Sequence, residues 1–136
     1  MKISGICLLL LILLMTACAT TNSATNATPH NSRDSLDWDG VYFGVIPSAS
    51  GSGIQVLIVL NRDYSFSLQY HYIDRDGSDL VVTGTFRWNE AGSIITLDTN
   101  IVPPYYQVGE NFLRQLDVRG RVITGNLAEN YILQKY

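Results

Sequence analysis

The sequence predicts an all-β fold, a small antiparallel barrel of about 7–9 short strands. Two nine-residue segments alternate between an apolar face and an opposite face that is mostly polar. This alternation is typical of strands with one buried face. In the first segment one face carries Tyr64, Phe66, Leu68, Tyr70 and Tyr72, and in the second Leu80, Val82, Gly84, Phe86 and Trp88. Regular short strands favour closure, because a closed barrel leaves no strand edge exposed.

Other segments have strand composition, and turn residues separate them. The breaks include Asn61-Arg62-Asp63, Arg75-Asp76-Gly77, Asn89 to Gly92 and Arg119-Gly120, which carry the chemistry of turns. No segment shows a helical period. The further strand candidates are 41–46, 54–60, 93–98, 105–108, 112–117, 122–125 and 131–135.

Residues 1–17 have the features of a lipoprotein signal peptide. Lys2 precedes an unbroken apolar run from Ile6 to Met15, which is shorter than the roughly 20 residues that a spanning helix needs. Small residues then lead to Cys18, which we expect to be lipidated and to become the new N-terminus. Ala19 stands where an aspartate would favour retention in the inner membrane of a Gram-negative cell. The predicted location is therefore the outer membrane, with a lipid anchor and the protein facing the periplasm.

Residues 18–36 are predicted to be the lipidated N-terminus and a disordered tether, because Ala19 to Ser35 contains no large apolar residue. Residues 37–136 form the predicted barrel, which is long enough for one core without disulfides. The formal charge of the whole chain is −3, and Lys and Arg do not cluster. A nucleic-acid partner is not expected, since it requires a basic stripe.

The opening of the barrel domain carries a family resemblance. Trp38 to Pro47, followed by Gly53-Ile54, resembles the start of the NlpE N-terminal domain, a family of outer-membrane lipoproteins linked to copper resistance and envelope stress. An aliphatic strand at 54–60 and Tyr70 follow at the same spacing. The later residues Leu113, Leu116-Asp117, Gly120, Ile123, Tyr131 and Leu133 also match in order. The resemblance implies a β-barrel fold and a location at the outer membrane.

The chain departs from that family at its metal motif. Where the family has Cys-x-x-Cys, this chain has Ser48 and Gly51 at the two cysteine positions. A cysteine pair suits Cu(I) or a redox couple, and neither a serine hydroxyl nor glycine does so at neutral pH. No metal and no cofactor are therefore expected here. Two interpretations of the loop stay open: a contact loop with Ser48, Ser50 and Ser52, or a connector that has lost the ancestral site.

Other candidate sites are weaker. Asp74 to Asp79 superficially resembles a calcium loop but lacks its terminal glutamate, so a solvated turn is expected. His71 has no second ligand nearby, and Asp37 and Asp39 flank Trp38, which is expected to plug a barrel end. The serines lack the base and the elbow of a hydrolase. The aromatic strips are expected to fill the interior, and Tyr105 and Tyr106 to form an exposed patch for a protein partner.

The sequence therefore predicts a non-enzymatic outer-membrane lipoprotein. Its expected partners are the membrane, through the lipid at Cys18, and another envelope protein, in envelope interaction or in stress or surface sensing. Two alternatives remain. One is a lipocalin-like carrier of a small apolar ligand, since both lipocalin-like and OB-like barrels fit the pattern. The other is copper homeostasis through a site without thiols.

Overall fold

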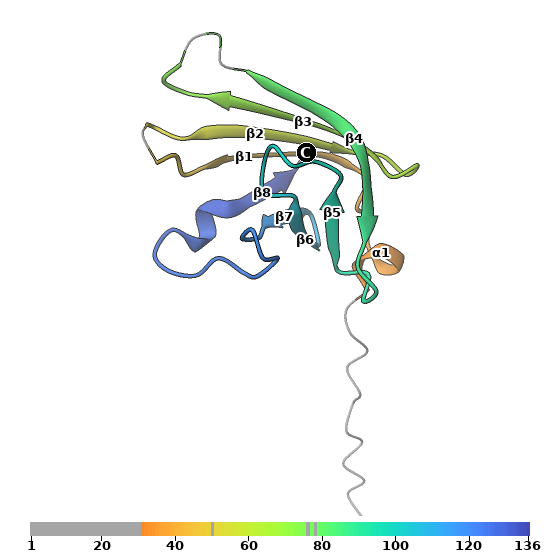
Figure 1. Ribbon diagram of the computed structural model, residues 1–136. Coiled ribbons are helices and arrows are strands. Elements are labelled where there is room, and N and C mark those ends of the chain that lie inside the picture. The colour runs from red at the N-terminus through yellow and green to blue at the C-terminus, as the bar shows by residue number, and fades with distance from the viewer. Residues whose placement is uncertain (1–30, 50, 76, 78) are drawn as a thin grey trace, which may run out of the picture.

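The structure is a computed structural model that describes residues 31–49, 51–75, 77 and 79–136. Strands β1 to β8 close into one antiparallel barrel in sequence order, which confirms the predicted fold. In Figure 1 the long strands β1 to β4 form the upper sheet and the shorter strands β5 to β8 lie below it. The elements are α1 (Ser32–Ser35), β1 (Gly40–Ile46), β2 (Ile54–Leu60), β3 (Ser65–Tyr72), β4 (Leu80–Trp88), β5 (Ile94–Leu97), β6 (Tyr105–Gly109), β7 (Phe112–Gln115), the 3-10 helix η1 (Ala128–Tyr131) and β8 (Ile132–Lys135).

The strands differ in how completely they are paired. The β1–β2 ladder spans both strands, from Gly40↔Leu60 to Ile46↔Ile54, and β2 pairs with β3 over 54–60, whereas β1 pairs with β8 only at Tyr42 and Phe43. β4 pairs with β3 through 80–85 but with β5 only through 86–88. The barrel therefore closes through the second half of β4. Among the described strands, the first half of β4 has a neighbour on one side only.

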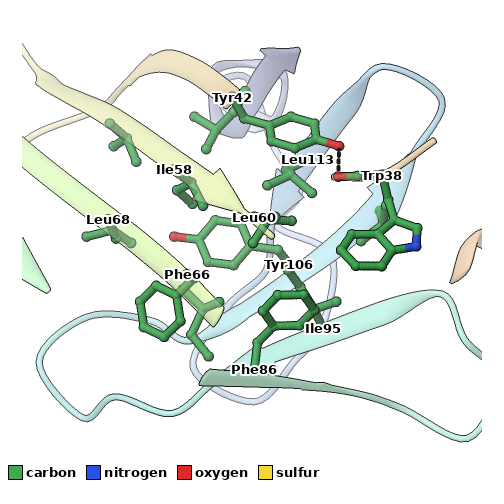
Figure 2. Packing of buried hydrophobic residues seen from close by; sticks show 14 of the residues in the cluster. Trp38, Tyr42, Ile58, Leu60, Phe66, Leu68, Phe86, Ile95, Tyr106 and Leu113 are labelled. Atoms are coloured by element: carbon green, nitrogen blue, oxygen red, sulfur yellow. Dashed lines mark hydrogen bonds between the residues drawn. The ribbon is translucent and has the colours of Figure 1, made fainter. Parts of the chain in front are cut away.

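The interior is filled by side chains that alternate along the strands. Ile58, Leu68, Ile95 and Leu133 are fully buried, and each such side chain contributes about 1.5–3 kcal/mol through burial of apolar surface. Tyr42 lies among them and donates its hydroxyl to the Trp38 carbonyl at 2.6 Å, as Figure 2 shows. The interior is thus packed as expected, and β3 and β4 supply Phe66, Leu68, Tyr70 and Phe86 to it.

Trp38 plugs one end of the barrel, as its place before β1 predicts. Its indole ring meets Phe86 edge-on at 5.7 Å and Trp88 at 5.5 Å, an arrangement that aromatic rings favour. The indole N–H donates to the Arg33 carbonyl at 3.1 Å. Tyr64, predicted to be on the inward face of its strand, instead lies in the turn before β3, with a φ of 65°, and the residue is 42% exposed.

The folded part begins earlier than the predicted boundary at residue 37. Residues 31–36, assigned from composition to the disordered tether, contain α1 and its two capping residues and pack against the barrel. Ser32 is buried, and its hydroxyl donates to the Val108 carbonyl at 2.7 Å. The Arg33 amide donates to the Gly92 carbonyl at 2.9 Å. Hydrogen bonds to backbone carbonyls, rather than burial of apolar side chains, hold residues 31–36 on the barrel. The hydropathy of the sequence therefore did not indicate that this segment is folded. The predicted signal peptide, Cys18 and the rest of the tether lie outside the described residues.

A second correction concerns 122–125, which was predicted to be a strand. Only one residue pair forms there, an isolated bridge between Leu116 and Val122. Val122 is 47% exposed, so its apolar composition reflects a surface segment rather than a buried strand. None of the helices in the described ranges is long and apolar enough to cross a membrane.

Candidate functional site

The loop at 47–53, between β1 and β2, is the position of the family's metal motif, and Asp74 holds it. The Ser52 amide donates to the Asp74 carboxylate at 2.5 Å, and the Ser52 hydroxyl donates to its other oxygen at 3.1 Å. The Ile73 amide donates to the Gly53 carbonyl at 3.2 Å. Two hairpin loops at one end of the barrel are therefore joined through one carboxylate.

Gly51, at the second cysteine position, matters for this contact. A Cβ atom built there would lie 2.7 Å from the Asp74 carboxylate, closer than ordinary packing allows. The glycine thus makes room for the carboxylate that holds the loop. Of the three serines predicted to form a contact loop, Ser52 is bonded to Asp74 and Ser48 is half-buried, whereas Ser50 lies outside the described residues.

The residues in this loop do not fit Cu(I). Its described side chains offer neutral hydroxyl oxygens, and Asp74 adds a carboxylate, a hard ligand; Cu(I) prefers thiolate and thioether sulfur. Within the described ranges, no group of three or more His, Cys, Asp or Glu side chains could hold a metal ion.

The calcium-like segment is divided between separate contacts. Asp74 faces the 47–53 loop, whereas Asp79 faces His71, whose Nδ1 lies 2.5 Å from an Asp79 carboxylate oxygen. Gln69 donates to the other Asp79 oxygen at 3.4 Å. The two carboxylates therefore have different partners and do not converge on one point.

Asp37 and Asp39 form a charge cluster with Arg62 at the opposite end of the barrel. The Arg62 guanidinium lies 2.8 Å from a carboxylate oxygen of each aspartate. Desolvation alone would raise the pKa of Asp39, but the charge and hydrogen bonds of Arg62 lower it overall. The lowered pKa keeps Asp39 ionised beside Arg62, and the contacts of Arg62 with both aspartates join the β2–β3 turn to the start of β1.

A groove of about 330 Å³ lies on the outer face of the sheet, and the sequence analysis did not predict it. Phe43 and Leu57 form its apolar wall, and the His71–Asp79 pair lies at its edge. The sequence of β2 did contain an indication of this groove. Leu57 and Val59 occupy outward positions that are normally polar in a strand with one solvated face. The full lining is Phe43, Gln55, Leu57, Gln69, His71 and Asp79.

The predicted patch at Tyr105 and Tyr106 is wrong for one of its two members. Tyr106 is completely buried, with its hydroxyl 3.5 Å from that of Tyr70, because it points into the barrel from β6. Tyr105 alternates outward and borders a second groove, which also contacts the exposed Ile101 and Val118. Alternation within β6 means that adjacent tyrosines cannot share one face.

The interior offers no opening for the carrier alternative among the residues described. Positions that would line a ligand cavity, such as Val56, Ile58 and Leu113, have no exposed surface and pack against one another. The groove at Phe43 and Leu57 lies on the outer face of the sheet. A barrel of this size either fills its interior or holds one small ligand, and this one is filled.

Comparisons with known proteins agree with this geometry. The model of the NlpE N-terminal domain matches residues 42–126. The crystal structure of a predicted lipoprotein from Shewanella oneidensis is 48% identical, with a TM-score of 0.71, over 78% of this chain and 95% of that one. The Cpx pathway activator NlpE from Escherichia coli is 22% identical with a TM-score of 0.52, over 64% of this chain and 46% of that one, a likeness in fold alone. A search of curated proteins found no match. This chain belongs to the NlpE N-terminal domain family.

Proposed function

We propose that this protein is a non-enzymatic outer-membrane lipoprotein, anchored through lipid on Cys18, whose barrel contacts another envelope component in stress or surface sensing. The observation that carries the proposal is the family match over 42–126 together with a barrel whose interior is filled. A filled barrel presents only its outer surface and loops, which suits a protein that is recognised rather than one that encloses a substrate.

The proposed anchor rests on the leader and on the relative in Shewanella oneidensis, itself described as a lipoprotein. A diacyl group with a further acyl chain holds a protein firmly on a membrane, whereas one chain holds it only marginally. We expect mass spectrometry of the mature chain to find lipid on an N-terminal Cys18 and density fractionation to place it in the outer membrane. A Cys18→Ala chain serves as the control. An unmodified Cys18 in the mature chain would disprove the anchor.

The proposed sensing role is tested by overproducing the chain in a cell that carries an envelope-stress reporter. The relative in Escherichia coli is named as an activator of the Cpx pathway, so a Cpx-dependent reporter is the first choice. We expect reporter output to rise with the wild-type chain and to rise further when Cys18→Ala leaves the barrel away from its membrane. An equally abundant chain with Leu113→Asp, which unfolds the core, is the control. A reporter that stays at its basal level with the wild-type chain would overturn the sensing role.

A further inference from the structure

The groove at Phe43 and Leu57 is built by side chains that are neighbours across paired strands. It lies on the outer face of the long strands that form the upper sheet in Figure 1. Phe43 of β1 lies opposite Leu57 of β2, and Leu57 lies opposite Gln69 of β3. In the neighbouring row, Gln55 lies opposite His71. Because backbone ladders fix these side chains relative to one another, the groove is preformed, as small-molecule sites usually are.

The other polar residues of the groove form a connected group around Asp79. His71 Nδ1 lies 2.5 Å from one Asp79 carboxylate oxygen, and the Gln69 amide donates to the other at 3.4 Å. A carboxylate only accepts, so His71 Nδ1 supplies the proton in this contact. The imidazole Nε2 and the Gln69 carbonyl oxygen are left for a ligand, since neither has a hydrogen-bond partner among the described residues.

Gln55 contributes an unpaired amide to the groove. The residue is half-buried, and its amide forms no hydrogen bond with any residue that the structure describes. A glutamine amide offers two N–H donors and a carbonyl acceptor. The groove therefore presents donors and acceptors directly beside the apolar surface of Phe43 and Leu57. A ligand that matches it needs groups that both donate and accept, together with an apolar face.

The charges of the lining narrow the class of ligand. Among the described residues that line the groove there is no lysine or arginine, and Asp79 is acidic, so an anion is disfavoured. Both oxygens of Asp79 already have partners, so a cation would have to displace His71 or Gln69. A wholly apolar ligand would cover the Gln55 amide and leave it unpaired. The class that remains is a neutral molecule with hydroxyl groups around an apolar face.

We propose that this groove binds a neutral saccharide. A pyranose ring has C–H groups on one face, which pack on an aromatic side chain, and hydroxyl groups at its edge, which donate and accept. The C–H face lies on Phe43 and Leu57. The hydroxyl groups bond to the side-chain amides of Gln55 and Gln69 and to Nε2 of His71.

The size of the groove fits a short stretch of a sugar chain. Its volume of about 330 Å³ is at the lower end of the roughly 300–1,000 Å³ that is typical of small-molecule sites. Tyr136 extends the aromatic surface, with its ring centroid 6.1 Å from that of Phe43 in an edge-on arrangement. Because Tyr136 is 81% exposed, a further sugar unit can pack there. We therefore expect an oligosaccharide to bind more tightly than a monosaccharide.

The class of ligand is tested by calorimetric titration of the full chain, purified in a detergent without a sugar headgroup. The probes are two neutral tetramers, cellotetraose and chitotetraose, and the chitosan tetramer, which has the chitotetraose backbone with free amines. We expect saturable binding of at least one neutral tetramer and weaker binding of the cationic one. The proposal is overturned if neither neutral tetramer binds saturably, or if the cationic tetramer binds as tightly as the better neutral one.

The polar side of the site is tested by removing the unpaired amide. Gln55→Leu keeps the size of the side chain but loses its donors and acceptor, so we expect it to weaken saccharide binding at least about tenfold. Gln107→Leu is the matched control, because Gln107 is on β6 and lines a different groove, and it should leave the affinity unchanged.

The aromatic wall is tested at Phe43. Phe43→Leu keeps an apolar side chain without a flat ring, so we expect binding to weaken at least about fivefold, whereas Phe43→Tyr keeps the ring and should retain the affinity. A thermal unfolding midpoint near that of the wild-type chain shows that each variant is folded. Wild-type affinity in folded Gln55→Leu or in folded Phe43→Leu would exclude the proposed arrangement.

Discussion

At the scale of single residues, Ser32 shows how a polar side chain extends the fold. It is 1% exposed, and its hydroxyl satisfies the Val108 carbonyl in β6. Removing one partner of a buried hydrogen bond leaves the other unsatisfied. We expect Ser32→Ala to lower the free energy of unfolding by about 1–2 kcal/mol, measured by urea denaturation. Ser35→Ala, exposed in the same helix, should change it by less than about 0.5 kcal/mol. Equal effects of the two changes would mean that α1 is not held through Ser32.

At Gly44 the backbone of β1 lies close to Ile132 and Leu133 of β8. A Cβ atom built there would lie 3.0 Å from the Ile132 carbonyl and 2.7 Å from the Leu133 side chain. Because a backbone atom cannot move aside cheaply, we expect Gly44→Val to destabilise the barrel by about 1–3 kcal/mol. Thermal unfolding should show a lower midpoint, whereas Val45→Thr, at an exposed neighbour, leaves it nearly unchanged. If Gly44→Val left the unfolding midpoint unchanged, the space between β1 and β8 at this position would have to be large enough for a valine side chain.

At the scale of elements, the 47–53 loop shows why two cysteines would restore the metal motif with reduced affinity. In Ser48→Cys with Gly51→Cys, the new side chain at position 51 meets the Asp74 carboxylate, and this negative charge also disfavours a thiolate. We expect this double variant to bind Cu(I), and the addition of Asp74→Ala to raise its affinity about tenfold. Competition with a chromogenic Cu(I) chelator measures both, with the wild-type chain as control. Equal affinities with and without Asp74 would show that the carboxylate does not shape the loop.

The elements that alternate most strictly were predictable from sequence, and the exceptions have physical reasons. β3 and β4 bury one face, so period-two alternation marked them clearly. The stretch 122–125 has strand-like residues but only one bridge, because composition alone does not supply a pairing partner. α1 is too short for a period and is held by polar contacts, so its sequence resembles that of a tether.

Candidate sites were less predictable than strands, because they depend on contacts between distant segments. The loss of the cysteine pair could be read directly at Ser48 and Gly51. The contact between Ser52 and Asp74 could not, since it joins two loops that are 22 residues apart. The outer groove had a sequence signal, apolar residues at the outward positions of β2, but locating it required the register that places Phe43 beside Leu57.

At the scale of the whole molecule, the barrel combines a filled interior with ladders that are incomplete on one side of β1 and of β4. Among the described residues the filled interior leaves no space for the ligand that a carrier would enclose, so the outer surface and the loops are what the barrel presents. A partner would therefore bind to the outer surface of the barrel. This is consistent with a protein whose proposed role is contact with other envelope components.

The same interior contains tyrosines whose ionisation should limit stability in alkali. Burial, followed by the charges of Asp39 and Asp37, raises the pKa of Tyr42 to about 12, against an ordinary value of 10.0. Burial also raises the pKa values of Tyr70 and Tyr106. Between about pH 10 and about pH 12, tyrosines such as Tyr42 lose their protons in the unfolded chain but keep them in the folded chain. The free energy of unfolding therefore falls as the pH rises. The contribution of Tyr42 is complete below about pH 10 and is lost as pH rises through about 12.

We therefore expect urea midpoints to fall steeply over this alkaline range, with tyrosinate absorbance showing that the buried tyrosines ionise only as the barrel unfolds. Tyr42→Phe is the informative variant. It loses the hydrogen bond to the Trp38 carbonyl and so is less stable at neutral pH by about 1 kcal/mol, but its alkaline decline should be shallower because one retained proton is gone. Tyr136→Phe, at an 81% exposed position, should keep the wild-type slope. If Tyr42→Phe declined as steeply as the wild-type chain, the Tyr42 hydroxyl would not be the group that couples proton release to unfolding.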